Sequence, residues 1–267
     1  MSADVKLSVE HISKHFLVNR QTGERVHALD DCSFRVNTGE VIALIGSSGC
    51  GKTTLLKIIH GLISADEGVI RVGGREVRGP GYDRGMVFQD SRLLPWRTAI
   101  DNVEFGLEIK KVPRSERRAI AERFINIVGL AGFEDRHPHQ LSGGMRQRIG
   151  LARALAIDPE VLLMDEPFGA LDAQTKELLQ AELLRIQAAT GKTILFVTHD
   201  LDEAVYLADR VIVMSPRPGR IREEVVVNIP RPRPDVAVVK QLPEFLARRT
   251  HIWESLSAVR LPDEDAA

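Results

Sequence analysis

The segment GSSGCGKTT at residues 46–54 constrains the fold of this chain most strongly. It fits a pattern of a glycine, four residues and then Gly-Lys-Thr, and it lies between the apolar run VIALI and the segment TLLKIIHGL. Because Leu55, Ile59 and Leu62 recur at helical spacing, we expect a buried strand, a tight loop and a helix in that order. Glycines let such a loop turn its N–H groups inward, and the helix N-terminus favours an anion. The pattern therefore predicts a phosphate-binding loop in an α/β fold.

The residue types in this loop indicate contacts with a nucleoside triphosphate. The Lys52 ammonium would reach the β- and γ-phosphates, and the Thr53 hydroxyl would ligate Mg²⁺. An ordinary glycine-rich turn with a chance lysine is the competing interpretation, and the strand, loop and helix in register argue against it. Because Cys50 lies in the loop, we expect its alkylation to block nucleotide binding and ATP to protect it. The residues expected to bind ATP through this loop are Gly46, Ser47, Ser48, Gly49, Cys50, Gly51, Lys52, Thr53 and Thr54.

The order of strand-like and helix-like segments also favours an α/β fold. Apolar runs make the first third β-rich, whereas residues 93–158 carry helical spacing, with Pro113 and Pro138 as breaks. After this insert come VLLMDE, a helix through AQTKELLQAELLRIQAA, TILFVTHD, a short helix in LDEAVYLAD, and RVIVMS. A buried strand, a helix and another buried strand indicate a parallel sheet. The segment IPRPRPD at 229–235 predicts a linker before a helical tail.

Size, charge and cysteine content limit the class of protein. The 267 residues are 43% hydrophobic, which suits one large domain or a core domain with a subdomain. A net charge of −1 does not favour nucleic acid as a partner, and two cysteines suit a reducing compartment. The N-terminal stretch lacks an apolar signal-peptide core, and no window approaches the ~18 apolar residues of a spanning helix. We therefore expect neither export nor membrane insertion.

Two carboxylates follow the apolar run Val161–Met164. Asp165 and Glu166 would be costly at the end of a buried strand unless a cation or a reacting water uses them. Alone, such a pair is more often a solvated strand end. After an intact phosphate loop, we expect Asp165 to hold Mg²⁺ through its water shell and Glu166 to polarise an attacking water.

A second glycine-rich segment, LSGGMRQR at 141–148, also leads into a helical pattern. One nucleotide cannot easily use two phosphate cradles from the same subunit. In a head-to-tail dimer, however, Ser142, Gly143 and Gly144 would cap the γ-phosphate held by Lys52 of the partner subunit. Each chain would then supply half of each of two sites.

The segments GSSGCGKTT, LSGGMRQR, VLLMDEP, ALD and VTHD, in this order and spacing, resemble the motif set of the ATP-binding subunits of ABC transporters. The likeness extends from residue 5 to about residue 225. It implies a P-loop NTPase core with a mostly parallel sheet, an N-terminal antiparallel β-subdomain and an inserted helical subdomain. It also implies an ABC ATPase domain at 1–225, with the helical subdomain at about 90–158, and leaves a C-terminal extension of unknown role at 226–267.

The resemblance implies roles for four side chains outside the phosphate loop. Phe16, where the family more often has tyrosine, would stack on adenine, although a core phenylalanine is the alternative. Gln89 would touch Mg²⁺ and sense a transmembrane partner. Asp172 would cross the dimer interface, and His199 would contact the γ-phosphate and position the catalytic carboxylate. The catalytic set implied is Glu166, His199 and Lys52, and the metal set is Thr53, Gln89 and Asp165.

These roles imply ATP-driven closure of a homodimer, which opens when hydrolysis removes the γ-phosphate. The stretches DSRLLPWRTAIDNVEFGLE and MSPRPGRI resemble importer subunits for nitrate, sulfonate and taurine. That resemblance implies a permease partner and, indirectly, a periplasmic or extracellular solute-binding protein, with this chain peripheral at the cytoplasmic face of the inner membrane. We expect the permease to dock in a groove near Arg92 to Trp96, although Trp96 would serve equally well as a core residue.

An exporter ATPase is the main alternative to an importer subunit, and the stretches LLPW and RPGRI argue against it. A DNA-repair ATPase would carry a long coiled-coil insertion between Gln89 and Ser142, which this chain lacks. Translation-type and resistance-type relatives usually carry two cassettes, and here a single motif set is present. A nucleotide-binding scaffold without hydrolysis would need a changed Glu166 or His199.

Overall fold

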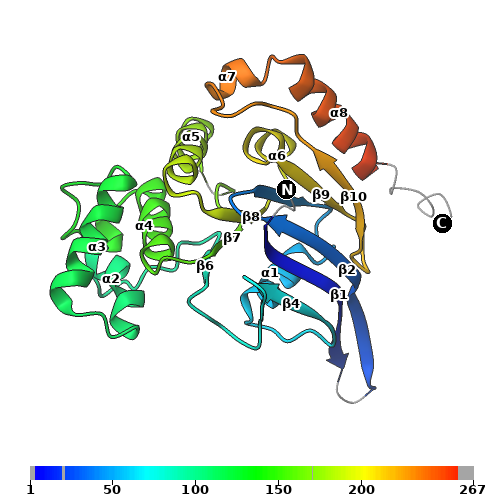
Figure 1. Cartoon of the computed structure of the whole chain (residues 1–267), viewed down its shortest axis with the longest axis horizontal. Coiled ribbons are helices and arrows are strands. Elements are labelled where there is room, and N and C mark those ends of the chain that lie inside the picture. Colours follow the sequence, from blue (N-terminus) through cyan, green and yellow to red (C-terminus); the bar gives the residue numbers. More distant parts are fainter. Residues whose placement is uncertain (1–3, 20–21, 170, 258–267) are drawn as a thin grey trace.

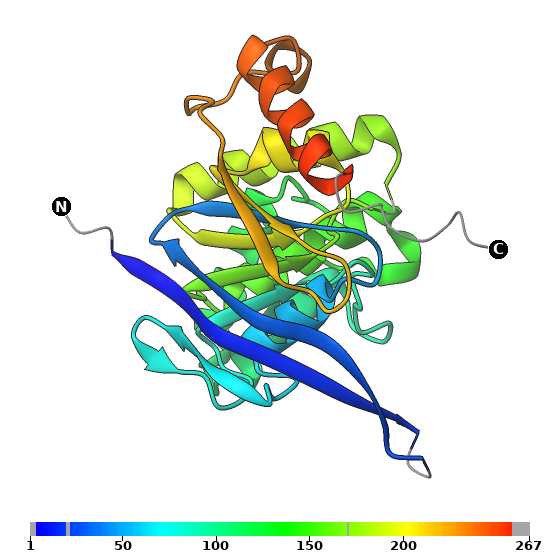
Figure 2. The same cartoon turned by 90° about the vertical axis from the view of Figure 1, so that its right-hand side faces the viewer.

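The computed structural model describes residues 4–19, 22–169 and 171–257. The described chain contains two sheets with helices packed against them (Figure 1). In the first sheet the strand order is β2-β1-β4-β5, and neighbouring strands are antiparallel. The bounds are β1 Val5–Asn19, β2 Glu24–Asn37, β4 Glu67–Val72 and β5 Arg75–Glu76. The paired ends of β1 and β2 project beyond the rest of the sheet (Figure 2).

The second sheet has the strand order β10-β9-β3-β8-β7-β6. Strands β9, β3, β8, β7 and β6 run parallel, and β10 pairs antiparallel with β9 at the edge. The bounds are β3 Val41–Ile45, β6 Arg84–Val87, β7 Val161–Asp165, β8 Thr193–Val197, β9 Arg210–Met214 and β10 Ile221–Val226. Apolar runs form β3, β7 and β8, as expected for strands covered on both faces. Strand β10 was not predicted, because IREEVV lacks strict alternation.

Strand β3 separates two hydrophobic cores. Val41, Ala43 and Ile45 face the larger core, which contains residues of α5 and α6, whereas Ile42 and Leu44 face the core that contains α1, β1 and β2. This division follows from the two-residue period of a strand. Helix α1 thus lies between the two sheets, and Cys50 of the loop that joins β3 to α1 is buried in the smaller core. The helix bounds are α1 Lys52–His60, α5 Ala173–Thr190 and α6 Leu201–Leu207.

Helix α1 is shorter than its apolar spacing predicted. Leu55 and Ile59 are buried as expected, but the helix ends at His60, and Gly61 takes a left-handed conformation with φ 87° as the C-cap. A Cβ at Gly61 would lie 2.3 Å from the carbonyl oxygen of Gly79, so a larger residue is excluded there. Leu62 lies beyond the helix and is 49% exposed, and its expected place on the helical face was wrong.

The chain between β6 and β7 is helical, as its spacing predicted. The bounds are α2 Ala99–Ile109, α3 Arg114–Ile127, the 3-10 helix η1 Pro138–Gln140 and α4 Gly143–Ala156. Helices α2, α3 and α4 pack against one another as a lobe at one side of the parallel sheet (Figure 1). Trp96, at the start of this lobe, is 72% exposed, which excludes the core alternative for its side chain.

The C-terminal segment folds back onto the parallel sheet. Helices α7 (Val236–Val239) and α8 (Pro243–Ser257) follow β10, and α8 lies over α6 (Figure 1). Phe245 and Ile252 of α8 are buried in the larger core. Residues 258–267 of the expected extension lie outside the described residues. Among the helices that the structure describes, none is long and apolar enough to cross a membrane.

Candidate functional site

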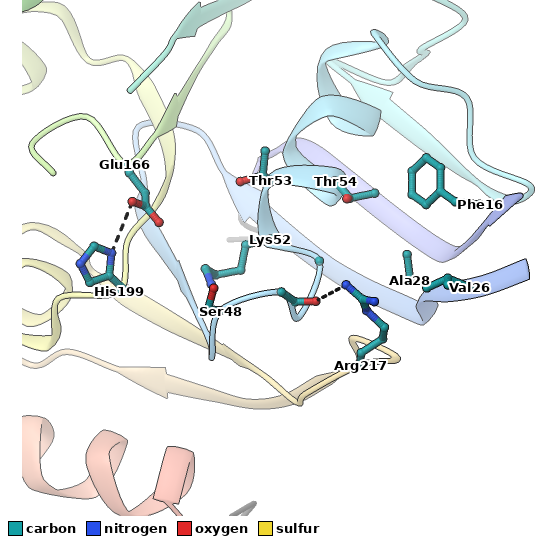
Figure 3. A pocket seen from close by; sticks show the side chains of 12 residues that line it. Phe16, Val26, Ala28, Ser48, Lys52, Thr53, Thr54, Glu166, His199 and Arg217 are labelled. Atoms are coloured by element: carbon teal, nitrogen blue, oxygen red, sulfur yellow. Dashed lines mark hydrogen bonds and ion pairs between the residues drawn. The ribbon is translucent and has the colours of Figure 1, made fainter. Parts of the chain in front are cut away.

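A cavity of about 590 Å³ opens over the loop that follows β3 (Figure 3). Side chains from distant parts of the chain complete its wall: Phe16 from β1, Glu166 after β7 and His199 after β8. Strands β3, β8 and β7 are neighbours in the sheet and run parallel, so their carboxyl ends meet at one edge. Ligands of open α/β sheets bind at this edge.

Lys52 begins α1, and its ammonium lies inside the loop. Nζ donates hydrogen bonds to the carbonyl oxygens of Gly46 at 2.8 Å and Ser47 at 3.0 Å, and the residue is 7% exposed. Gly51 precedes the helix with φ 104°, and a Cβ there would lie 2.6 Å from Cδ2 of Leu29, so the turn requires glycine. The ammonium and the N-terminus of α1 together favour an anion in the cavity.

The Cys50 side chain packs beneath the loop, into the core, and does not line the cavity. The residue is 1% exposed, its Sγ lies 3.8 Å from Nζ of Lys52, and a Cβ on Gly46 would lie 2.6 Å from that sulfur. A thiol packed in this way is shielded from alkylating reagents, so the expectation of a loop thiol open to alkylation was wrong. Cys32 is also buried and free, and burial raises its pKa to about 11.

Thr53 and Asp165 meet where α1 approaches the end of β7. Thr53 Oγ1 donates a hydrogen bond of 2.9 Å to Oδ1 of Asp165. Burial raises the pKa of Asp165 against the effect of this hydrogen bond, and the charge of Glu166 raises it further. A cation here would favour the ionised carboxylate, and a hydroxyl beside a carboxylate provides the hard oxygen donors that Mg²⁺ prefers.

The described residues contain no cluster of three or more His, Cys, Asp or Glu side chains able to hold a metal ion. Mg²⁺ keeps several waters and binds substrate phosphates, so it needs only one or two ligands from the protein. The Thr53–Asp165 pair therefore fits the ion that the sequence implied.

Glu166 and His199 are held side by side at the cavity. Nδ1 of His199 lies 3.4 Å from Oε2 of Glu166 (Figure 3). Glu166 takes a left-handed conformation with φ 44°, which is uncommon for a residue other than glycine and is typical of functional sites. Its backbone N–H donates to the carbonyl oxygen of Val197 at 3.0 Å. Gln89 Nε2 donates to Oε2 of Glu166 at 3.4 Å, so a third strand end reaches the same carboxylate.

Phe16 stands on the far wall of the cavity from Glu166 (Figure 3). Its side chain is half-buried beside Val26 and Ala28, and Nζ of Lys14 lies 5.6 Å from the centre of its ring. An aromatic face is thus available at the rim, as base stacking requires. Phe16 is therefore not a buried core phenylalanine, which was the alternative.

The second glycine segment lies outside this cavity within one chain. Ser142 is the N-cap of α4, and its Oγ accepts from the N–H of Met145 at 3.2 Å. Gly143 lines a separate groove of about 380 Å³ together with Gln89. Gly144 faces α5, where a Cβ on it would lie 2.8 Å from Cγ2 of Thr175. The close approach of α4 and α5 is therefore one reason for glycine at this position.

Asp172 is the N-cap of α5. Its Oδ1 accepts from the N–H of Thr175 at 3.0 Å, and this hydrogen bond lowers the pKa of the exposed carboxyl. Ser142, Gly143, Gly144 and Asp172 do not line the cavity over Lys52 in the described part of a single chain.

Arg217 is a cavity residue that the sequence analysis did not assign. It follows β9, and its Nη2 donates to the carbonyl oxygen of Gly49 at 3.3 Å, which adds positive charge to the loop (Figure 3). The sequence signal was an arginine in the proline-rich turn SPRPGR, which also contains Arg220. Arg220 instead pairs with Asp30, and the turn alone does not distinguish the two.

The sequence of this chain matches a known protein family. The model of the family described as ABC transporter matches residues 29–169. The chain belongs to the ABC transporter ATP-binding family. It is 54% identical over 252 residues to an ABC transporter ATP-binding protein of Methanocaldococcus jannaschii, covering 94% of this chain and 91% of that protein. It is 48% identical over 228 residues to the taurine import ATP-binding protein TauB of Yersinia pseudotuberculosis, covering 84% and 89%.

Solved structures of the family agree with the fold. A dimeric ATP-binding cassette bound to ADP and phosphate matches with a TM-score of 0.73 and 31% identity over 84% of this chain and 99% of that chain. CbiO1 of Clostridium perfringens, part of the ABC transporter complex CbiONQ, matches with a TM-score of 0.75 and 28% identity over 94% and 99%. The resemblance and the α/β P-loop fold that the sequence predicted are confirmed. This ABC protein is an ATPase that binds ATP and couples its hydrolysis to transport.

Proposed function

We propose that this ABC ATPase powers the import of a small solute, such as nitrate, a sulfonate, taurine or a similar anion, through a membrane permease. The observation that carries the hydrolytic part is the Glu166–His199 pair of 3.4 Å at the cavity that Lys52 lines. Similarity to proteins named as taurine import ATP-binding proteins supports the import direction and the class of solute. An exporter ATPase remains the competing function, and the experiment below separates the two.

In this proposal the loop and its surroundings bind the nucleotide. Phe16 stacks on the base, Lys52 contacts the β- and γ-phosphates, and Arg217 adds positive charge at the loop. The backbone N–H groups of the loop face the phosphates. The nucleotide-binding residues proposed in the loop are Gly46, Ser47, Ser48, Gly49, Cys50, Gly51, Lys52, Thr53 and Thr54.

Thr53 and Asp165 are the proposed holders of Mg²⁺, with Gln89 reaching the same region through its contact with Glu166. When bound, the ion would neutralise charge on the phosphate oxygens. The chain's own contribution to hydrolysis is the Glu166 carboxylate, which orients a water and accepts its proton as that water attacks the γ-phosphorus. The bond from the γ-phosphorus to the bridging oxygen breaks, and His199 holds Glu166 in place and contacts the γ-phosphate.

Each nucleotide in this proposal is shared by two copies of the chain. Ser142, Gly143 and Gly144 cap the γ-phosphate from the partner subunit, and Asp172 crosses the interface. The support is that these residues lie at helix N-termini outside the cavity of their own chain. Loss of the γ-phosphate removes the shared contact and lets the subunits separate.

The proposed transport partners are transmembrane permease subunits, which this chain contacts at the cytoplasmic face of the inner membrane, and indirectly a periplasmic or extracellular solute-binding protein. The exposed Trp96 and the groove beside Gln89 support a docking surface near Arg92 to Trp96. We retain the division into an ATPase domain at 1–225, with its helical subdomain at about 90–158, and a C-terminal extension at 226–267.

A pull-down tests the function as a whole. Tagged Glu166→Gln protein is incubated with ATP and detergent-solubilised membranes, and co-purifying proteins are identified by mass spectrometry, with Lys52→Ala as the matched variant that cannot hold the phosphates. We expect a permease with Glu166→Gln. Uptake of labelled taurine and nitrate into cells that lack and then regain this chain determines the direction. Solute efflux dependent on the chain would favour the exporter.

A further inference from the structure

A partly buried lysine, Lys176, joins α5 to the turn that carries His199. Nζ of Lys176 lies 2.6 Å from Oδ2 of Asp200 and 3.1 Å from Oε2 of Glu203. The Glu203 side chain is 3% exposed, and that of Lys176 is 20% exposed. One ammonium thus bridges two carboxylates from the start of α6, immediately after His199. Helices α5 and α6 are neighbours on the same side of the parallel sheet (Figure 1).

Lys176 lies in the first turn of α5, and hydrogen bonds and packing hold this turn in place. Asp172 caps the first turn of α5 through the N–H of Thr175, and Thr175 packs against Gly144 at the start of α4. Lys176 follows Thr175 directly. The position of Lys176, and with it that of Asp200, therefore depends on the first turn of α5 and on the N-terminus of α4.

The position of His199 depends on the backbone that surrounds it. Its side chain is 67% exposed, so packing constrains the ring little. The N–H of Asp200 donates to Oγ1 of Thr198 at 3.0 Å, and Oδ1 of Asp200 accepts from the N–H groups of Asp202 at 2.9 Å and Glu203 at 3.2 Å. Because Oδ1 caps α6 while Oδ2 binds Lys176, Asp200 transmits the position of Lys176 to the turn.

The charges in this cluster explain why the lysine matters. Burial raises the pKa of Glu203 to about 7, against the lowering effect of Lys176. Burial lowers the pKa of Lys176, but its hydrogen bond to Asp200 and the charge of Glu203 outweigh this, and the net shift is upward. Without the ammonium, the pKa of Glu203 would rise further and Asp200 would lose its partner, so Glu203 would take up a proton and the contact that holds the turn against α5 would be lost.

We propose that Lys176 is a positioning residue for hydrolysis: it holds the His199 turn against the first turn of α5, so that the imidazole keeps its place beside Glu166. This inference rests on the proposed catalytic roles of Glu166 and His199. It links the segment proposed to cross the dimer interface to the proposed catalytic histidine through one side chain.

The test compares variants of the full chain. Lys176→Met is expected to lower kcat about tenfold to a hundredfold, because misplacement of a catalytic group by about 1 Å has an effect of that order. The KM for ATP stays near the wild-type value, since Lys176 does not line the cavity. Lys176→Arg, which restores a cation able to bridge both carboxylates, recovers most of the lost kcat.

Two further variants keep the test independent of stability. Lys176→Met combined with Glu203→Gln removes both charges of the pair, so no unpaired buried charge remains and the protein should fold. This double variant still lacks the bridge, and its kcat should fall by the same factor. Lys240→Met is the matched control, because Lys240 also joins α5 to α6, through Glu177 at 3.2 Å and Asp202 at 3.8 Å, but at the surface. Its kcat should stay within about twofold of wild type.

Histidine NMR reports on the His199 ring directly, and its signals would not change if Lys176 only stabilised the fold. In protein labelled with ¹⁵N-histidine, the ring signals of His199, assigned with His199→Ala, should shift in Lys176→Met and return in Lys176→Arg. Wild-type kcat in the folded double variant, or unchanged His199 signals in Lys176→Met, would overturn the inference. If His199→Ala itself hydrolysed ATP at the wild-type rate, the proposed catalytic role would fail instead, and the two failures are thereby distinguished.

Discussion

Thr53 Oγ1 and Asp165 Oδ1 lie 2.9 Å apart, joining the first turn of α1 to the carboxyl end of β7. The hydroxyl belongs to the phosphate loop and the carboxylate to the strand that leads to Glu166, so this contact joins the segment proposed to bind the nucleotide to the residue proposed to act in hydrolysis. Burial raises the pKa of Asp165, which means that the ionised carboxylate is less stable there without a cation.

Thr53→Val is expected to lower the Mg²⁺-dependent part of ATP affinity about tenfold, equivalent to about 1.4 kcal/mol, because an oxygen donor is lost. ATP affinity is measured by equilibrium dialysis with Mg²⁺ and with EDTA. Thr54→Val is the neighbouring control, and any loss there should be equal under both conditions. Equal Mg²⁺ dependence in Thr53→Val and wild type would contradict the assignment.

Glu166→Gln is expected to lower kcat by a factor of about 10² to 10⁴, the usual contribution of a general base. ATP binding persists, since the loop is unchanged, and the ATP-bound dimer should accumulate. Phosphate release and light scattering measure the two effects, with Glu122→Gln on the exposed face of α3 as a control. Light scattering that shows only monomers with ATP and Mg²⁺ would count against the shared site.

Cys50 is expected to resist alkylation in the folded protein, with or without ATP, because it is 1% exposed beneath the loop. Iodoacetamide labelling followed by mass spectrometry, in native buffer and in guanidinium chloride, tests this. Both thiols should react only in the denaturant, since Cys32 is buried as well. Rapid native labelling of Cys50 that ATP prevents would restore the expectation drawn from the sequence.

Arg233→Ala is expected to lower the free energy of unfolding by about 3 kcal/mol or more, because it leaves buried carbonyl groups without their donor. The Arg233 side chain is 0% exposed and donates to the carbonyl oxygens of Val205, Tyr206 and Ala208 at the end of α6. Guanidinium denaturation measures the change. Arg249→Ala removes a half-exposed pair with Asp202 and should cost less than about 1 kcal/mol.

Glu203 is expected to make the protein less stable as pH rises from about 4.5 to about 7. Its pKa is raised from 4.5 to about 7 in the folded state, so within this window the unfolded chain has lost the proton that the folded chain still binds. Unfolding free energies at several pH values should fall by up to about 3 kcal/mol from this group alone. In Glu203→Gln that contribution should vanish. An unchanged pH slope would show that the group titrates normally.

The phosphate loop was predictable because its signal is contiguous. Its glycines, lysine and threonine stand within one short segment, between an apolar run and helical spacing. Asp165 and Glu166 were assigned to that loop because two carboxylates at the end of a buried strand need a cation or a reacting water, whereas the role of His199 came from the family resemblance. Spacing along the chain says nothing about distance in space. Strand order β3-β8-β7 brings the three strand ends together.

Other features could not be predicted from local pattern. Strand β10 exists because β9 offers it an edge, and Leu62 leaves α1 because Gly61 must turn against Gly79. The burial of Cys50, the entry of Arg217 into the cavity and the contact between Gly144 and Thr175 each depend on a partner far away in the sequence.

By itself, the sequence determined the local conformations, from the strand–loop–helix unit around Lys52 to the helical insert and the alternation of buried strands with helices. Torsional preferences and side-chain periodicity act within a few neighbouring residues, so they can be seen in one segment at a time. Only the tertiary structure decided which distant side chains meet, such as Glu166 with His199 and Lys176 with Glu203. Strand order and helix packing determine which side chains become partners. The strength of each contact depends on burial, which no single segment encodes.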